Sequence, residues 1–374
     1  MKQILYFLML SILFSCNNVK EKTTESEMSL TIYDSIIVKG SKILIRDFNP
    51  MTGLYLANNR NSKDIVLFDK TGKIKILFNR YGKGPKEYSL IRDVDFWDDN
   101  SLVILTGNVL QHYEITGKYI QTIELDNENP ITTRIRLSVF TDMENNKNIF
   151  YYADSIPDIN NYSNEYYFNT MRLFYLVNPG KKFTRRFIKI DEKSKYSKDI
   201  IYTHYLPNYS INNEKRCIDI NFPNEQKIFR YDLDDSLKLI KSFPISADFF
   251  REDKGTPVGR KPKNSITDMI QTPNFVKVFS FGDTLLTLYF GGLDEKKETY
   301  SIEQANIKMS EVPKYIQVFI NEKKVVPDIK LPNRIMSIRY IHNLNEIVFA
   351  KAPNNYDELH NTNTFLIGKI EYEK

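Results

Sequence analysis

A hairpin that occurs twice in the first third of the chain constrains the fold more than any other feature. Residues 65–74 and 111–120 both contain an apolar strand, an acidic residue, a Thr-Gly-Lys turn and a second apolar strand. Glycine suits the turn because it adopts positive φ without a steric penalty. A degraded copy lies at 229–237. The pattern indicates that one small β module is used repeatedly along the chain.

Strand signals continue on both sides of this hairpin. From residue 31 onward, alternating patterns and short runs of β-branched and aromatic residues are bounded by Asn, Asp, Gly and Pro, with almost no helical periodicity. A second repeat, Ile-Arg-Asp at 45–47 and again at 91–93, precedes a turn and an apolar strand. Strands at the corresponding place in each unit are predicted at 54–58, 102–106, 149–153, 216–220, 285–290 and 346–350.

Six similar units predict an all-β fold, a six-bladed β-propeller of four-stranded antiparallel blades over residues 31–374. Each unit would span about 60 residues, longer than common propeller repeats, which predicts long loops in the middle blades. The strand at 31–38 is expected to complete the last blade beside 364–370, because closing the ring protects sheet edges. A pair of β-sandwiches and a seven-bladed ring are the alternatives.

The first 15 residues predict a lipoprotein signal peptide. Lys2 precedes an apolar run at 4–14, which is shorter than the roughly 20 residues that a membrane span needs. The run ends in Leu13-Phe14-Ser15-Cys16, which resembles a bacterial lipobox. The resemblance implies that Cys16 carries a diacylglycerol and a further acyl chain such as palmitate. Residues 16–30 are then a polar tether, and the protein is expected in the bacterial cell envelope, at the outer membrane, on its periplasmic or its outer side.

A loop between the first two repeats carries a more specific motif. Its sequence is Arg80-Tyr81-Gly82-Lys83-Gly84-Pro85-Lys86-Glu87-Tyr88. The loop resembles the Gly-x-Gly-Pro-x-Glu-[Tyr/Phe] signature of the six-bladed β-propeller lipoproteins of Bacteroidetes-type bacteria, which are related to the NHL and TolB-like propellers. The match is specific over residues 45–125, and beyond 126 only the strand rhythm agrees. The resemblance implies a binding propeller of the cell envelope, from a family often encoded beside glycan-uptake systems.

Two interpretations of this loop remain open. Gly82 and Gly84 can adopt positive φ, Pro85 fixes the exit of the loop, and Glu87 can accept backbone hydrogen bonds or pair with a neighbouring arginine. In the structural interpretation, the loop pins one blade to the next. In the functional interpretation, its polar and aromatic side chains form a binding site at the mouth of the central channel. The candidate binding residues are then Arg80, Lys83, Glu87 and Tyr88.

Further candidate binding residues lie at repeated blade positions and in a long loop. Asp47, Asp93 and Asp95 could line the channel together, although an Asp beside an Arg at a strand end also suits a structural ion pair. Tyr162 and Tyr166 lie in an insertion rich in Asn and Tyr. Tyrosine rings stack on the apolar face of a pyranose while amides bond its hydroxyl groups, so these residues suit sugar recognition.

Several function classes find no support. Lysine and arginine number 52 against 47 acidic residues, an excess too small for a nucleic-acid binder. The four histidines are scattered singly, and the sequence has neither a nucleotide-binding nor a metal-binding motif, so we predict no cofactor and no metal. With Cys16 acylated, Cys217 has no partner for a disulfide within the chain and is expected to be a small buried hydrophobe.

The sequence therefore favours a lipid-anchored, non-catalytic propeller that binds a glycan or a protein partner of the envelope through its loop-rich face. The alternative is a propeller hydrolase or lyase, similar in architecture to lactonase-type enzymes with a divalent metal in the central channel. An enzyme of that kind should bring together three or more Asp, Glu, Asn or His side chains in the channel. A binder should present aromatic and amide side chains there, without converging carboxylates.

Overall fold

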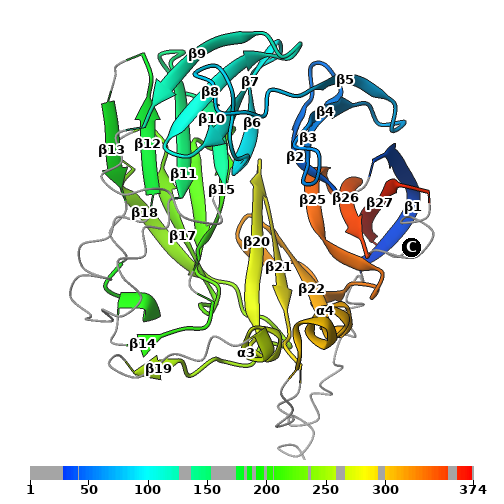
Figure 1. Ribbon diagram of the computed structural model, residues 1–374. Coiled ribbons are helices and arrows are strands. Elements are labelled where there is room, and N and C mark those ends of the chain that lie inside the picture. The colour runs from blue at the N-terminus through cyan, green and yellow to red at the C-terminus, as the bar shows by residue number, and fades with distance from the viewer. Residues whose placement is uncertain are drawn as a thin grey trace, which may run out of the picture.

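The computed structural model describes residues 28–40, 42–125, 136–152, 174–180, 183–187, 191–197, 200–204, 206–234, 237–257, 266–293, 300–352 and 360–372. They form a six-bladed β-propeller, in which the innermost strand of every blade faces the centre of the ring (Figure 1). In this part of the chain six antiparallel sheets contain four or five strands each, one per blade. The predicted fold class is confirmed, and the sandwich and seven-bladed alternatives are excluded.

The first three blades follow one another along the chain, each running from its innermost to its outermost strand. Blade 1 contains β2 (Ile43–Asn49), β3 (Leu54–Asn59), β4 (Ile65–Phe68) and β5 (Ile74–Phe78). Blade 2 contains β6 (Asp93–Asp98), β7 (Ser101–Thr106), β8 (Val109–Glu114) and β9 (Tyr119–Glu124). Blade 3 contains β10 (Leu137–Thr141), β11 (Lys147–Tyr152), β12 (Phe174–Asn178) and β13 (Phe183–Phe187).

The remaining blades follow the same plan with one addition and one exchange. Blade 4 contains β15 (Asn208–Asn212), β16 (Cys217–Asn221), β17 (Lys227–Asp232) and β18 (Leu239–Pro244). Blade 5 contains β20 (Asn274–Phe281), β21 (Thr284–Phe290), β22 (Lys314–Ile320), β23 (Lys323–Lys324) and β24 (Ile329–Lys330). Blade 6 contains β25 (Ile335–Asn343), β26 (Glu346–Lys351), β27 (Thr362–Tyr372) and, as its outermost strand, β1 (Met28–Lys39).

Blade 6 closes the ring with the first and last described strands. β1 pairs with β27 in antiparallel register from Met28↔Tyr372 to Lys39↔Thr362, with one irregularity at Ile32/Asp34. This pairing confirms the prediction that the strand near residue 31 completes the last blade. The strand begins at Met28, three residues before the expected boundary between tether and propeller, because Met28 packs into the apolar core between blades 5 and 6.

Burial explains why second strands read as continuous apolar runs while outer strands alternate. All six residues of β7 are buried, as are all five of β16, since neighbouring blades cover both faces of these strands. In the outer strand β5, exposed and partly buried side chains alternate. Cys217, the first residue of β16, is buried as predicted.

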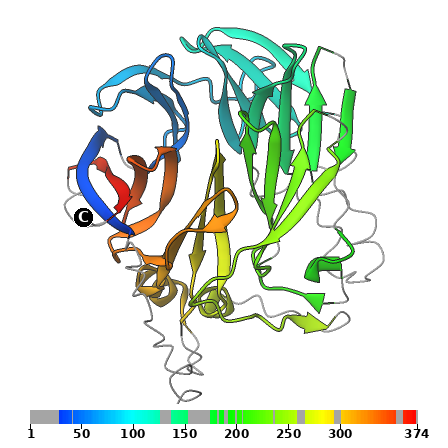
Figure 2. The ribbon, with the colours of Figure 1, turned by 180° about the vertical axis from the view of Figure 1, so that it is seen from behind.

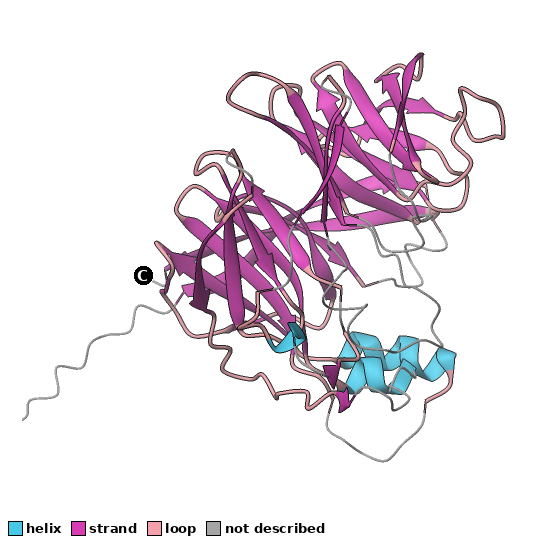
Figure 3. Cartoon of the chain, turned by 90° about the vertical axis from the view of Figure 1, so that its left-hand side faces the viewer, coloured by secondary structure: helices cyan, strands magenta, loops and turns pink. Residues whose placement is uncertain are grey.

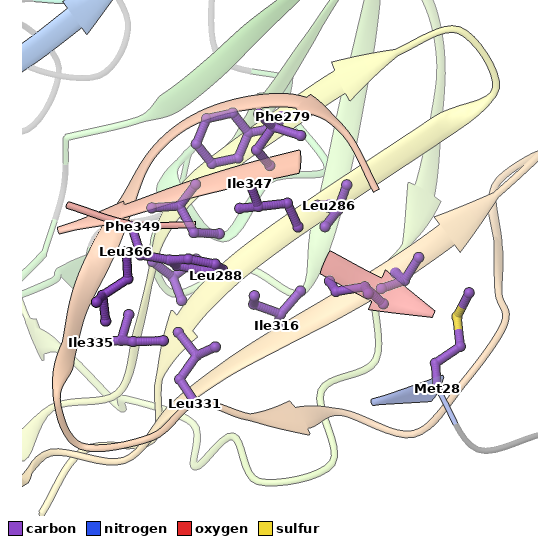
Figure 4. Close-up of a cluster of buried hydrophobic side chains, with 14 of the residues drawn as sticks. Met28, Phe279, Leu286, Leu288, Ile316, Leu331, Ile335, Ile347, Phe349 and Leu366 are labelled. Carbon is purple, nitrogen blue, oxygen red and sulfur yellow. The ribbon is translucent and has the colours of Figure 1, made fainter. Parts of the chain in front are cut away.

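Each of the six contacts between neighbouring blades holds one apolar cluster. Figure 4 shows the cluster between blades 5 and 6, where Leu286 and Leu288 of β21 face Ile347 and Phe349 of β26. The hydrophobic core is therefore divided among the blade contacts, and it leaves the centre of the ring to other side chains.

The repeated Thr-Gly-Lys turn also joins neighbouring blades. Gly72 and Gly117 have φ of +81° and +86°, as the sequence predicts. A Cβ on Gly72 would lie 2.1 Å from the carbonyl oxygen of Ile37 in β1, and one on Gly117 would lie 2.7 Å from the ring of Phe78 in β5. Each hairpin tip thus packs on the outer strand of the preceding blade, and both conformation and space require glycine.

Within the described ranges, two short helices interrupt the strand pattern, and the sequence analysis missed them. α3 (Ile266–Gln271) and α4 (Ile302–Glu311) lie side by side at the edge of the ring (Figure 3). The 3-10 helix η1 (Lys195–Ser197) and the ribbon of β14 (Ile200–Ile201) and β19 (Thr256–Pro257) occupy the same edge (Figure 2). A capping box of Ser301 and Gln304 begins α4, which is the sequence signal that could have found it. None of the helices in the described part is long and apolar enough to cross a membrane.

Candidate functional site

A polar cavity of about 340 Å³ lies at the centre of the ring, where the innermost strands of all six blades contribute to its wall. The charged residues that line it are Arg46, Asp47, Asp93, Asp95, Arg136, Glu214 and Arg339. Ser138, Ser210, Asn212, Asn213, Tyr340 and His342 add hydroxyl, amide and ring groups. The expectation that Asp47, Asp93 and Asp95 line the channel together is confirmed.

The three aspartates link neighbouring blades through backbone hydrogen bonds. The N–H of Phe96 in blade 2 donates to Asp47 Oδ2 of blade 1 at 3.3 Å. In blade 3, the N–H of Leu137 donates to Asp93 Oδ2 at 2.8 Å and that of Val139 to Asp95 Oδ2 at 2.6 Å. An innermost strand has a sheet partner on one side only, so every second N–H needs an acceptor elsewhere. These carboxyl groups supply it.

Burial and mutual repulsion change the ionisation of these carboxyl groups. Burial raises the pKa of Asp93, although Arg46, whose guanidinium lies 3.2 Å away, opposes the shift. Burial also raises the pKa of Asp95 well above its usual value, and the negative charge of Asp47 and a side-chain hydrogen bond to it raise the pKa further. The raised pKa favours the protonated form of Asp95, which can donate a hydrogen bond to Asp47.

The basic residues around the cavity differ in how well they are partnered. Arg46 donates from Nε to Asn58 Oδ1 at 2.8 Å and pairs with Asp93. Arg136 donates to the carbonyl oxygen of Tyr209 at 2.6 Å and lies 5.3 Å from the centre of that ring. Arg339 makes no ion pair with any described residue, and its buried Nε has no hydrogen-bond partner.

An aromatic cluster forms the wall beside blades 1 and 6. The ring of His342 lies 4.2 Å from that of Phe48 and 5.0 Å from that of Tyr340. Its Nε2 is 3.0 Å from the hydroxyl oxygen of Tyr55. Burial lowers the pKa of His342, so that its neutral form is favoured. The ring is a neutral hydrogen-bonding group against which an apolar ligand face can pack.

The loop of residues 80–88, called the Gly-Pro loop, lies between blades 1 and 2. None of its residues contributes to the cavity wall. Tyr88 is fully buried, donates to the carbonyl oxygen of Lys63 at 2.9 Å and contacts the ring of Tyr113 edge-on. Arg80 donates to the carbonyl oxygen of Gly117 at 3.1 Å. These contacts pin one blade to the next, as the structural interpretation expects. Lys83 and Glu87 lie on the exposed surface of the loop.

Gly82 of this loop makes a close contact that the sequence analysis did not predict. Neither Gly82 nor Gly84 has positive φ, so that expectation was wrong. Instead, Glu87 folds back over the loop and accepts the N–H of Gly84 at 2.8 Å. A Cβ on Gly82 would lie 1.9 Å from Glu87 Oε2. Glycine at position 82 leaves room for the carboxylate. The bond from the N–H of Gly84 confirms the prediction that Glu87 accepts a backbone hydrogen bond.

Three candidate residues, Cys16, Tyr162 and Tyr166, lie outside the described residues. Within the described part, no group of three or more His, Cys, Asp or Glu side chains is arranged to hold a metal ion. Cys217 is a free, buried cysteine, and burial raises the pKa of its thiol to about 11.

The sequence analysis missed Arg136, Lys277 and Arg339, although a signal for them exists. An aliphatic residue followed by a base recurs at 45–46, 91–92, 135–136, 276–277 and 338–339. Each basic residue of these pairs lies in or directly before the innermost strand of its blade. Radial repetition therefore brings three of these residues, Arg46, Arg136 and Arg339, to the wall of one cavity.

Fold and site together define a six-bladed β-propeller with a charged axial cavity. Residues 23–206 match the family model DUF5128, which is described as a 6-bladed beta-propeller. No curated protein sequence matches the chain.

Two solved structures support the same fold over almost the whole chain. A member of the DUF4221 family from Bacteroides vulgatus is similar with a TM-score of 0.69 and 14% identity, over 93% of this chain and 100% of that protein. A putative exported protein from Bacteroides fragilis is similar with a TM-score of 0.50 and 15% identity, over 94% of this chain and 96% of that protein. At these identities the likeness establishes the fold alone.

Proposed function

We propose that this protein is a non-catalytic binding propeller of the bacterial cell envelope, anchored through a lipid on Cys16, which recognises a glycan with its axial cavity. The cavity itself carries the proposal. Its volume of about 340 Å³ is at the small end of ligand pockets, which suits one sugar residue better than a protein segment. The hydroxyl, amide and aromatic groups of its wall are those that bind sugars.

The roles of the aspartates favour binding over catalysis. Asp47, Asp93 and Asp95 converge, as expected of an enzyme, but each accepts a backbone N–H from the next blade. In each carboxyl group the oxygen that accepts this N–H is occupied in joining two blades, which leaves fewer free lone pairs for attack on a substrate or for proton transfer. The wall is therefore built for recognition by groups held in fixed positions.

A glycan array with the purified protein tests this function, followed by calorimetric titration of the best ligand. Asn213 is an exposed amide at the edge of the cavity, and Asn213→Ala is expected to weaken binding. Lys83→Ala, in the exposed part of the Gly-Pro loop, is the matched control and should bind as the wild type does. The reverse result would move the site to the loop, and capture of a protein with no glycan signal would favour the protein-partner alternative.

A second candidate function, hydrolysis, is favoured by one observation, the carboxyl pair of Asp95 and Asp47 in the cavity wall. A carboxyl group with a raised pKa beside a second carboxyl group is an arrangement used for general acid–base catalysis. Incubation of each bound glycan with the protein, followed by mass spectrometry, tests this candidate. Product formation that Asp95→Asn abolishes would replace the binding function, whereas unchanged glycans support it.

A further inference from the structure

The geometry points to an anion-binding site in the axial cavity, which we call the anion seat. In this site Arg339, with Arg46 and Arg136 facing the same space, binds the carboxylate or sulfate group of an acidic sugar. The inference deepens the proposed function and relies on it for the sugar, while the seat for the anion can be tested separately. It begins with position. The three arginines come from blades 6, 1 and 3, and all line the same cavity.

Strand irregularities account for the placement of two of these side chains. In β2 the pairing register shifts between Ile45 and Asp47, and in β25 it shifts between Ile338 and Tyr340. Arg46 and Arg339 are the residues at these two bulges. A bulge turns a side chain away from the alternation of its strand, and here both turned side chains line the cavity.

Arg339 is an arginine of this cavity that no carboxylate of the described residues neutralises by an ion pair, although Glu214 lies in the same wall. Asp93 is paired with Arg46, and Asp95 shares a hydrogen bond with Asp47. Arg339 has no carboxylate partner among the described residues, and burial, together with the positive charges of Arg46 and Arg60, lowers its pKa to about 10. Its buried Nε lacks an acceptor, which is an unfavourable state for a charged donor.

Lys277 of β20 is also affected by the positive charges of the cavity arginines. Its ammonium lies 5.5 Å from the centre of the Phe279 ring, and it forms no ion pair with a described residue. Burial lowers the pKa of Lys277 well below its usual value, and the positive charges of the three cavity arginines lower it further. A bound anion would favour the charged form of Lys277 and supply the acceptor that Arg339 lacks.

The chemistry of arginine and the size of the cavity define the ligand. A guanidinium presents a planar fork of donors that matches the paired oxygens of a carboxylate, and it also binds sulfate or phosphate. A cavity of about 340 Å³ holds one sugar residue rather than a long polyanion. Ser138, Ser210 and Asn213 lie in the same wall for the hydroxyl groups. A uronic acid or a sulfated monosaccharide fits this combination.

Calorimetric titration of the purified protein at constant ionic strength tests the seat. The probes are sodium glucuronate, glucose 6-sulfate, inorganic sulfate and, as the neutral match, glucose. Glucuronate or glucose 6-sulfate should bind at least about tenfold more tightly than glucose, and Arg339→Gln should remove that preference. Arg334→Gln removes the same charge from an exposed position just before the same strand, outside the cavity wall, and should leave binding unchanged.

Two further measurements keep the test decisive. Arg339→Lys retains the charge without the fork and should bind with intermediate affinity. Glucuronate should raise the melting temperature of the wild type more than glucose does, which requires no variant. Equal binding of glucuronate and glucose, or full binding by a folded Arg339→Gln variant, would overturn the seat and leave the glycan function standing. Binding of inorganic sulfate without any sugar would support the seat and refute the glycan function.

Discussion

The raised pKa of Asp95 leads to a prediction that can be worked out in detail. Replacing Asp95 by Asn keeps the hydrogen bonds, because an amide can donate to Asp47 and accept the N–H of Val139 as the protonated carboxyl does. The substitution removes only the ability to ionise. We therefore expect Asp95→Asn to fold normally and to differ from the wild type mainly in how its stability depends on pH.

The direction in which stability changes with pH follows from proton binding by the folded and unfolded states. Burial raises the pKa of Asp95 in the folded protein, whereas an unfolded aspartate has a pKa of about 3.9. Between these two values the folded state holds the proton and the unfolded state does not, so this group's contribution to stability decreases as pH rises. The decrease approaches about 1.4 kcal/mol for each pH unit, begins near pH 4 and ends at the raised pKa.

Urea unfolding followed by fluorescence measures the effect. The free energy of unfolding of the wild type minus that of Asp95→Asn should fall as pH rises from about 4 toward the raised pKa of Asp95, with a slope approaching about 1.4 kcal/mol per unit. Glu124→Gln, on the exposed side of the outer strand β9, controls for the loss of one acidic group. Parallel curves for wild type and Asp95→Asn would refute the proposed protonation of Asp95.

Three further predictions concern other parts of the chain. Gly82→Ala should cost about 0.5–1.5 kcal/mol, because the exposed carboxylate of Glu87 must move and give up its bond to the loop; in a Glu87→Ala background, urea unfolding should show a smaller loss, and an equal loss would contradict the contact. Tyr88→Phe should cost about 1–2 kcal/mol without changing ligand affinity; loss of affinity in the folded variant would place the loop in the binding site. Cys16→Ala should abolish incorporation of a fatty-acid probe in cells, whereas retained labelling would disprove the lipid anchor.

The cavity wall both joins neighbouring blades and presents an arginine to a ligand, and these two roles depend on each other. Ser280 of blade 5 donates its N–H to Ser210 Oγ of blade 4 at 2.9 Å, just as the aspartates join blades 1, 2 and 3. Neutral and acidic acceptors thus satisfy the backbone at the axis. Because some of these acceptors are carboxylates, the arginines around them tolerate burial, and the arginine left unmatched is the one that a ligand can use.

Much of the fold could be predicted from sequence because it depends on local signals. The apolar runs at the second strand of each blade and the Thr-Gly-Lys turns were identified correctly, since strand burial and positive φ leave direct marks on residue choice. α3 and α4 were missed because helices of this length have little periodicity to detect. The conformation of Gly82 was missed because its constraint is a side chain five residues away, not its own φ.

The sequence by itself determined the module, the approximate number of modules and the aspartates that repeat with it. Only the tertiary structure decided which side chains share the cavity. Arg46 and Arg339 stand near opposite ends of the chain and meet because β1 closes the ring and because bulges turn both toward the axis. Strand register fixes the direction of a side chain, and register depends on pairing between strands. Local sequence does not record that pairing.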